Sequence, residues 1–104
     1  MTDHKTDLSQ SDQDALDAAT FRRLLKHLDA NKDVQNIDLM ILAGFCRNCL
    51  SKWYKSAADE AGLDVDMDTA RQRVYGMAYG DWKANHQPKA TSEQLAAFEG
   101  RKIK

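Results

Sequence analysis

The chain has few residues that interrupt helices and no excess of charge of either sign. One proline and five glycines occur in 104 residues, and the many Ala, Leu, Lys, Asp and Gln residues favour an all-helical chain. Charged residues make up 30% of the sequence but leave a net charge of −1. A surface for nucleic acid needs an excess of Lys and Arg on one face, so this balance argues against a nucleic-acid partner.

Long apolar runs and cysteines are equally scarce. The longest apolar run, Leu39 to Cys46, is interrupted by Gly44 and is too short to cross a bilayer. The polar start MTDHKTDLSQSDQD lacks the apolar segment of a signal peptide. Two cysteines without an export signal favour a reducing compartment and free thiols. We therefore expect a cytoplasmic protein with no membrane partner.

The apolar spacing predicts a compact bundle of about four helices around a long central helix. The helices are expected near residues 12–30, 37–61, 69–85 and 91–99, as one domain over 11–100. Residues 1–10 are expected to form a polar tail and residues 101–104 a basic tail. The predicted core consists of Phe21, Leu25, Leu28, Leu42, Cys46, Leu50, Trp53, Val74, Trp82 and Phe98.

Local signals support these boundaries. Ser11 with Asp14 and Thr91 with Gln94 have the spacing of helix N-terminal capping pairs. Asn36 is placed to cap the central helix, and Asp66 or Asp68 to cap the helix after it. Gly62 followed by Leu63 predicts the end of the central helix.

Three segments carry a family resemblance: FRRLL at 21–25, DVQNIDLMILAGFCRNCLSKWY at 33–54, and VYGM at 74–77 followed by Trp82 and Lys83. Together they resemble a small bacterial family known only as domain of unknown function 1244, over about residues 21–98, with FCRNCL as the most specific part. The resemblance implies a compact helical domain of bacterial origin with no established activity. That family often has Pro after the Met of YGM; Ala78 stands here, which predicts a straight helix over 69–85.

Cys46 and Cys49 are the most obvious candidates for chemistry. Three residues apart on a helix, their sulfurs could share a zinc ion or form a redox pair. Zinc would need further ligands, for which His27 and His86 are candidates. A redox pair needs its first Cys at a helix N-terminus in a βαβ setting, whereas the predicted central helix places Cys46 well inside, on the stripe of Leu42. We predict packed core cysteines and no cofactor, with zinc binding and thiol redox chemistry as alternatives.

Arg71 lies within the apolar face of the predicted third helix. A guanidinium there is expected to form an internal ion pair, and Asp38 is the one acid in the apolar start of the central helix. The alternative is an anion-binding residue beside Tyr75 and Tyr79.

Ile37, Ile41 and Phe45 form a second apolar stripe on the predicted central helix. The first helix could cover it, but that helix has only one narrow apolar stripe of its own. The pattern therefore predicts a homodimer with this stripe near its two-fold axis. Another bacterial protein is the alternative partner.

The sequence contains no P-loop, dinucleotide-binding, zinc-protease or nucleophile-elbow pattern, so no catalytic residue is assigned. It predicts a protein-interaction or oligomeric accessory module. A metal or thiol protein centred on Cys46 and Cys49 is the alternative. A small enzyme using Arg71 and nearby tyrosines would have no catalytic constellation behind it.

Overall fold

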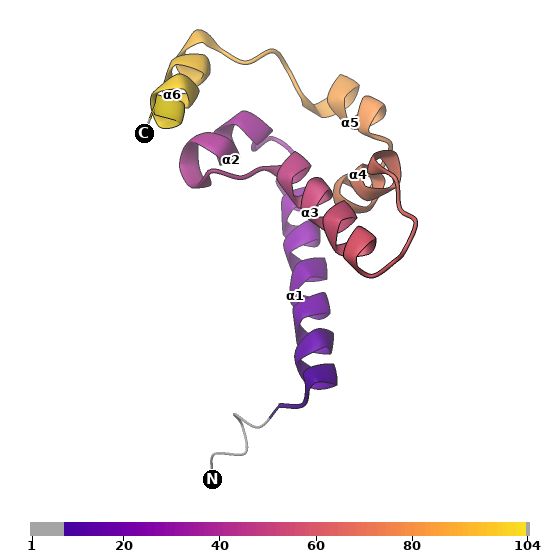
Figure 1. Cartoon of the computed structure of the whole chain (residues 1–104). Helices are drawn as coiled ribbons and strands as arrows, with labels where there is room; N and C mark the ends of the chain where they lie inside the picture. The colour runs from indigo at the N-terminus through magenta and orange to yellow at the C-terminus, as the bar shows by residue number, and fades with distance from the viewer. Residues whose placement is uncertain (1–7, 104) are drawn as a thin grey trace. The chain divides into compact units, whose positions relative to one another are not determined.

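The computed structural model of the chain describes residues 8–103, and all regular structure within that range is helical (Figure 1). The predicted all-α class is confirmed. The predicted N-terminal tail lies largely outside the described residues. The chain divides into two compact units, Met1–Ala30 and Asn31–Lys104, and each is described by itself.

The first unit contains α1 (Gln10–Ala30). Its N-terminal pair is Ser9 and Asp12: the Asp12 N–H donates to Ser9 Oγ at 3.0 Å, and the Ser9 N–H donates to Asp12 Oδ2 at 3.4 Å. The predicted Ser11–Asp14 cap is therefore wrong by two residues. Leu25 and Leu28 are buried, as predicted.

The predicted central helix is two helices. α2 (Asn36–Ala43) ends at Gly44, and α3 (Arg47–Glu60) begins after Cys46. Gly44 adopts φ 75°, and its N–H closes α2 on Met40 O. This left-handed conformation costs glycine almost nothing, so the apolar run turns a corner at the residue that lacks a side chain. The prediction of one helix over 37–61 was wrong.

The predicted third helix is interrupted in the same way. α4 (Met67–Tyr75) ends at Gly76, with φ 75°, and α5 (Tyr79–His86) follows. Ala78 precedes α5 at φ −58° and ψ 136°, an extended conformation that proline also adopts. The break therefore occurs without a proline, and the expected straight helix was wrong.

The last helix is longer than predicted. α6 (Ser92–Ile103) continues through Gly100 and includes most of the predicted basic tail. Its cap is confirmed: the Gln94 N–H donates to Thr91 Oγ1 at 3.0 Å and the Thr91 N–H donates to Gln94 Oε1 at 2.8 Å. Gln94 Nε2 also donates to Asp38 Oδ1 at 2.8 Å, which ties α6 to α2, the helix it lies against (Figure 1).

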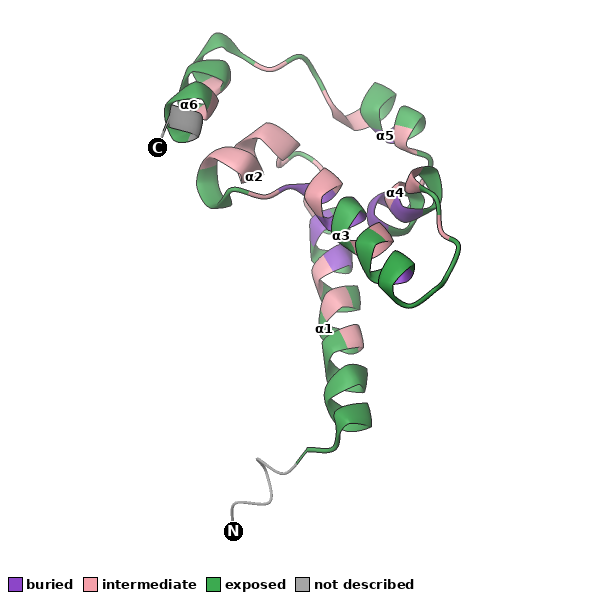
Figure 2. Ribbon diagram, in the orientation of Figure 1, coloured by how far each residue is buried: buried purple, intermediate pink, exposed green. Residues whose placement is uncertain are grey.

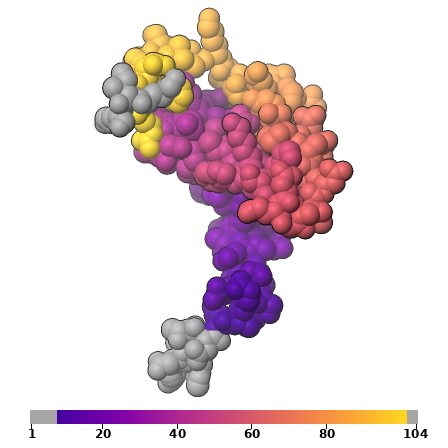
Figure 3. All heavy atoms as spheres, viewed as in Figure 1, coloured from indigo at the N-terminus to yellow at the C-terminus, as the bar shows by residue number. Residues whose placement is uncertain are grey.

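Within the second unit, buried residues gather where α3, α4 and α5 meet (Figure 2). Ala58 of α3 and Ala70 of α4 are both buried, and such small side chains let two helices approach closely. Figure 3 shows the same elements as filled space. Within the second unit, the buried apolar residues are Cys46, Leu50, Ala58, Ala70, Val74, Tyr75 and Trp82.

Four of these seven were predicted, but two other predictions of core position were wrong. Leu42 is 79% exposed and Trp53 is 57% exposed. Both were predicted to lie in the core because the apolar spacing of a single helix was assumed to continue through Gly44. Because the chain turns there, the stripe before the glycine does not continue after it. Phe21 and Phe98 are half-buried.

None of the helices in the described range is long and apolar enough to cross a membrane.

Candidate functional site

Cys46 and Cys49 lie at the N-terminal end of α3, not in the middle of one long helix. Cys46 is the N-cap residue, with extended backbone at φ −150° and ψ −176°, and Cys49 is in the first turn. Both thiols are free; Cys46 is buried and Cys49 is partly exposed. The prediction that Cys46 lies deep within a helix was wrong. The argument against a redox pair that rested on this position therefore no longer holds.

The Cys46 thiol is in a mixed electrostatic environment. Burial raises the pKa of Cys46, and the nearby Cys49 thiol adds to this. The backbone N–H groups of Cys49 and Asn48 act in the opposite direction and lower it. The sum is a raised pKa, so this thiol is protonated at neutral pH.

The two residues between the cysteines are anchored in a polar network. Arg47 is only 2% exposed. Its Nη1 donates to Val34 O at 2.7 Å and to Asn36 Oδ1 at 3.1 Å, and its Nη2 donates to Asn31 O at 3.1 Å. The guanidinium also lies over the Trp82 ring, 5.0 Å from its centroid. Arg47 thus fixes the start of α3 to the segment that precedes α2.

Tyr75 extends this network from α4. Its hydroxyl donates to Asn48 Oδ1 at 2.8 Å and accepts from Asn36 Nδ2 at 3.0 Å. Burial strongly raises the pKa of Tyr75, so the phenol stays protonated and able to donate. Its ring meets Trp82 edge-on, with centroids 4.9 Å apart. One buried tyrosine therefore joins the beginnings of α2 and α3 to α4 and α5.

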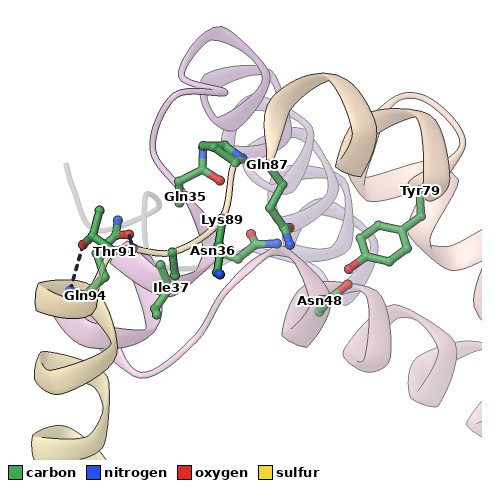
Figure 4. Close-up of a pocket in the computed structure, with 11 residues that line it drawn as sticks. Gln35, Asn36, Ile37, Asn48, Tyr79, Gln87, Lys89, Thr91 and Gln94 are labelled. Carbon is green, nitrogen blue, oxygen red and sulfur yellow. Dashed lines mark hydrogen bonds between the residues drawn. The ribbon is translucent and has the colours of Figure 1, made fainter.

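A cavity of about 520 Å³ opens beside this network (Figure 4). In Figure 4 the Tyr79 hydroxyl is directed towards Asn48, and Lys89 reaches towards Asn36 and Ile37. The lining is rich in amides and carries one cationic side chain, so it offers hydrogen bonds rather than an acid–base pair. It is formed by Gln35, Asn36, Ile37, Asn48, Tyr79, Gln87, Pro88, Lys89, Ala90, Thr91 and Gln94.

The histidine candidates for metal binding are placed as follows. His86 ends α5, with its ring 5.9 Å from that of Trp82 and its carbonyl accepting from Gln35 Nε2 at 2.9 Å. His27 is exposed on α1. Among the residues described, no three His, Cys, Asp or Glu side chains form a group able to hold a metal ion.

Arg71 and Asp38 are not brought together as the predicted ion pair. The carboxylate beside Arg71 is Asp68, at 3.5 Å within α4, and the guanidinium lies 5.2 Å from the ring centroid of Tyr79. Asp38 accepts from the Gln35 N–H at 2.9 Å and from Gln94. Asp68 and the Gln35 N–H are local partners, each three residues away, whereas the contact of Asp38 with Gln94 depends on how α6 packs against α2.

The predicted interface residues are only partly covered. Ile37 and Ile41 of α2 are half-buried, and Phe45 follows Gly44 and stacks on Trp53 with ring centroids 6.3 Å apart. Arg101 Nη1 donates to Ile41 O at 3.2 Å. Ile37 and Ile41 therefore stay on one helix, and the break at Gly44 removes only Phe45 from the predicted stripe.

These features define a class by architecture: a small helical protein whose interior contains a polar network of arginine, asparagine and tyrosine. Residues 34–100 match the family described as protein of unknown function (DUF1244), and the chain belongs to this family. The family resemblance is confirmed over this range, and the segment FRRLL at 21–25 lies outside it. No curated protein matches the chain.

Proposed function

We propose that this protein is a self-associating interaction module whose contact surface comprises α2 and the Phe45–Trp53 pair. The supporting observation is the state of α2, NIDLMILA, which is apolar on all sides after its first turn yet has no buried residue. In Figure 2 this helix has no purple segment. A helix apolar all round is normally buried, so a second molecule would supply the missing cover.

The aromatic pair extends this surface beyond α2. Phe45 and Trp53 are stacked with an interplanar angle of 24°, and more than half of Trp53 is exposed. Phe and Trp are enriched at the centres of protein interfaces, where their large faces are desolvated. Leu42, in the last turn of α2, is the most exposed large apolar side chain among those that the structure describes in the second unit.

A second copy of the chain fits this surface better than a charged partner does. The only charged residue of α2 is Asp38, and its carboxylate is already engaged by the Gln35 N–H and by Gln94. An isologous contact places the same patch on both subunits, which requires a patch that does not repel itself. Each large apolar side chain buried there would contribute about 1.5–3 kcal/mol.

Sedimentation across a concentration series tests the proposal, with wild type compared with Leu42→Lys. Because Leu42 is exposed, the substitution should leave the fold intact and abolish the dimer. Leu63→Lys is the matched control: Leu63 is also exposed, lies after α3 away from the proposed surface, and should leave association unchanged. A wild-type chain that remains monomeric and soluble at high concentration would refute self-association. The same surface would then be proposed to bind a different protein.

A further inference from the structure

The two cysteines have the positions of an N-terminal capping pair. Cys46 is the N-cap of α3 and Cys49 is the third residue of that helix, the spacing at which a capping side chain lies over the first turn. The N-cap side chain and the side chain three residues later both lie over the first turn of the helix, and the Cys49 thiol is among the groups that raise the pKa of Cys46. The break at Gly44 places this pair at a helix N-terminus, where the sequence predicted the interior of one long helix.

The segment between the two sulfurs is held in place from both sides. Arg47 is anchored to Val34 O at 2.7 Å and Asn31 O at 3.1 Å, and Asn48 accepts from the Tyr75 hydroxyl at 2.8 Å. The first turn of α3 is therefore already ordered before the cysteines are linked, so forming the disulfide costs little further conformational entropy. Groups held near each other in this way react as if at a very high local concentration.

We infer that Cys46 and Cys49 form a reversible intramolecular disulfide by exchange with a low-molecular-weight disulfide. The partly exposed Cys49 loses its proton and its sulfur attacks the small disulfide. The S–S bond of that molecule breaks, one thiolate leaves, and a mixed disulfide remains on Cys49. Cys46 then releases its proton to solvent, and its sulfur attacks the Cys49 sulfur. The second small thiolate leaves, so two electrons have passed from the protein to the oxidant.

The difference in burial sets the order of these two steps. Cys46 is 7% exposed, which keeps a bulky disulfide away from its sulfur, whereas Cys49 is accessible from solvent. Cys46 needs to reach only the sulfur of Cys49, which belongs to the first turn of the same helix. Burial also raises the pKa of Cys46, which suits a thiol that acts second and within the protein.

The experiment equilibrates the full chain in mixtures of reduced and oxidised glutathione. Free thiols are trapped by acid and alkylation, and the products are weighed by mass spectrometry. Wild type should show one transition in which both thiols disappear together, with the loss of two hydrogens and no bound glutathione. Accumulated glutathione adducts, a disulfide between two chains, or thiols that oxidise only in denaturant would each overturn the inference.

Single substitutions test the order of attack. Cys46→Ser should trap glutathione on Cys49, because the resolving thiol is gone. Cys49→Ser should react with the same disulfide at least about tenfold more slowly, since only the buried thiol remains. Equal rates for the two variants, both helical by circular dichroism, would contradict the assigned order.

The anchoring of Asn48 can be tested separately. Tyr75→Phe removes the hydroxyl that bonds Asn48 and should lower the equilibrium constant for disulfide formation about twofold to tenfold. Both proteins are compared under conditions in which circular dichroism shows them folded. An unchanged constant would show that the network does not preorganise the cysteines. None of these outcomes depends on whether the chain self-associates.

Discussion

Asn36 is the residue on which the buried polar network converges. Its Oδ1 accepts from the Arg47 guanidinium at 3.1 Å and from the Arg47 N–H at 3.4 Å, and its Nδ2 donates to Tyr75. The sequence predicted only that Asn36 caps a helix, and this was wrong by one residue, because the N-cap is Gln35. A polar residue that binds partners 11 and 39 positions away leaves no periodic signal in the sequence.

Removing this amide should destabilise the protein. Asn36→Ala removes an acceptor from Arg47 and a donor from the Tyr75 hydroxyl, and both of those side chains are only 2% exposed. The expected loss in the free energy of unfolding is about 1–3 kcal/mol, measured by urea denaturation. Asn85→Ala is the control, because Asn85 is exposed on α5 and its loss should change little. Equal effects of the two substitutions would mean that the network contributes nothing specific.

Asp66 gives a prediction about pH. It caps α4 by accepting from the Thr69 N–H at 2.8 Å, and this hydrogen bond lowers the pKa of Asp66. A lowered pKa in the folded state stabilises the protein above the pKa of the unfolded chain. The contribution is lost as the pH falls through the folded-state pKa.

Asp66→Asn isolates that contribution, since asparagine also caps helices but does not titrate in this range. The stability of wild type relative to Asp66→Asn should therefore be constant above about pH 5 and decline as the pH falls further, through the lowered folded-state pKa of Asp66. Chemical denaturation at a series of pH values measures it. A difference that is constant with pH would show that the carboxylate charge plays no part in the cap.

At the scale of elements, the sequence predicted helical segments well and their breaks poorly. The cap of α4 is Asp66, one of the two residues predicted for it, and the predicted capping pair of Thr91 with Gln94 is confirmed; each cap depends on residues three positions apart. The predicted end of α3 is confirmed too: Gly62 has φ 73°, and the Leu63 N–H donates to Ala58 O at 2.8 Å. Local signals of this kind do not depend on the tertiary fold.

The breaks at Gly44 and Gly76 were missed for a physical reason. Apolar spacing continues across both glycines, and a glycine inside a helix costs only about 1 kcal/mol relative to alanine. Sequence periodicity therefore cannot distinguish a tolerated glycine from one that ends a helix. The predicted position of Cys46 and Cys49 assumed an unbroken helix through Gly44, which is why it was wrong.

Alanine at Gly44 should be destabilising because it cannot adopt φ 75° without strain. The expected cost is about 1–2 kcal/mol, and an added Cβ would also lie 2.6 Å from Arg101 Nη2. Gly80→Ala is the matched control: Gly80 lies within α5 with open space around its Cβ position, so alanine there should be neutral or stabilising. Thermal unfolding compares the two. A Gly44→Ala protein as stable as Gly80→Ala would mean that a continuous helix over 37–61 is accessible after all.

At the scale of the molecule, apolar surface is distributed unevenly between interior and solvent. The interior of the second unit relies on Trp82, Tyr75 and small side chains around an arginine, while Leu42 and Trp53 face outwards. The sequence predicted excess apolar surface near the start of the central segment but assigned it to Ile37, Ile41 and Phe45. The exposed apolar side chains also include Leu42 and Trp53, which were predicted to be buried, because the turn at Gly44 changes which residues share a face.

The two tryptophans report on this surface separately. Trp53 is 57% exposed and Trp82 is 1% exposed, so at low protein concentration acrylamide should quench Trp53 and spare Trp82. If the surface is the dimer contact, quenching of wild type should fall as concentration rises, because a second copy covers Trp53. Trp53→Phe retains an aromatic ring beside Phe45 and should give weak quenching at every concentration. A dimer seen by sedimentation in which Trp53 remains fully quenchable would place the contact elsewhere on the molecule.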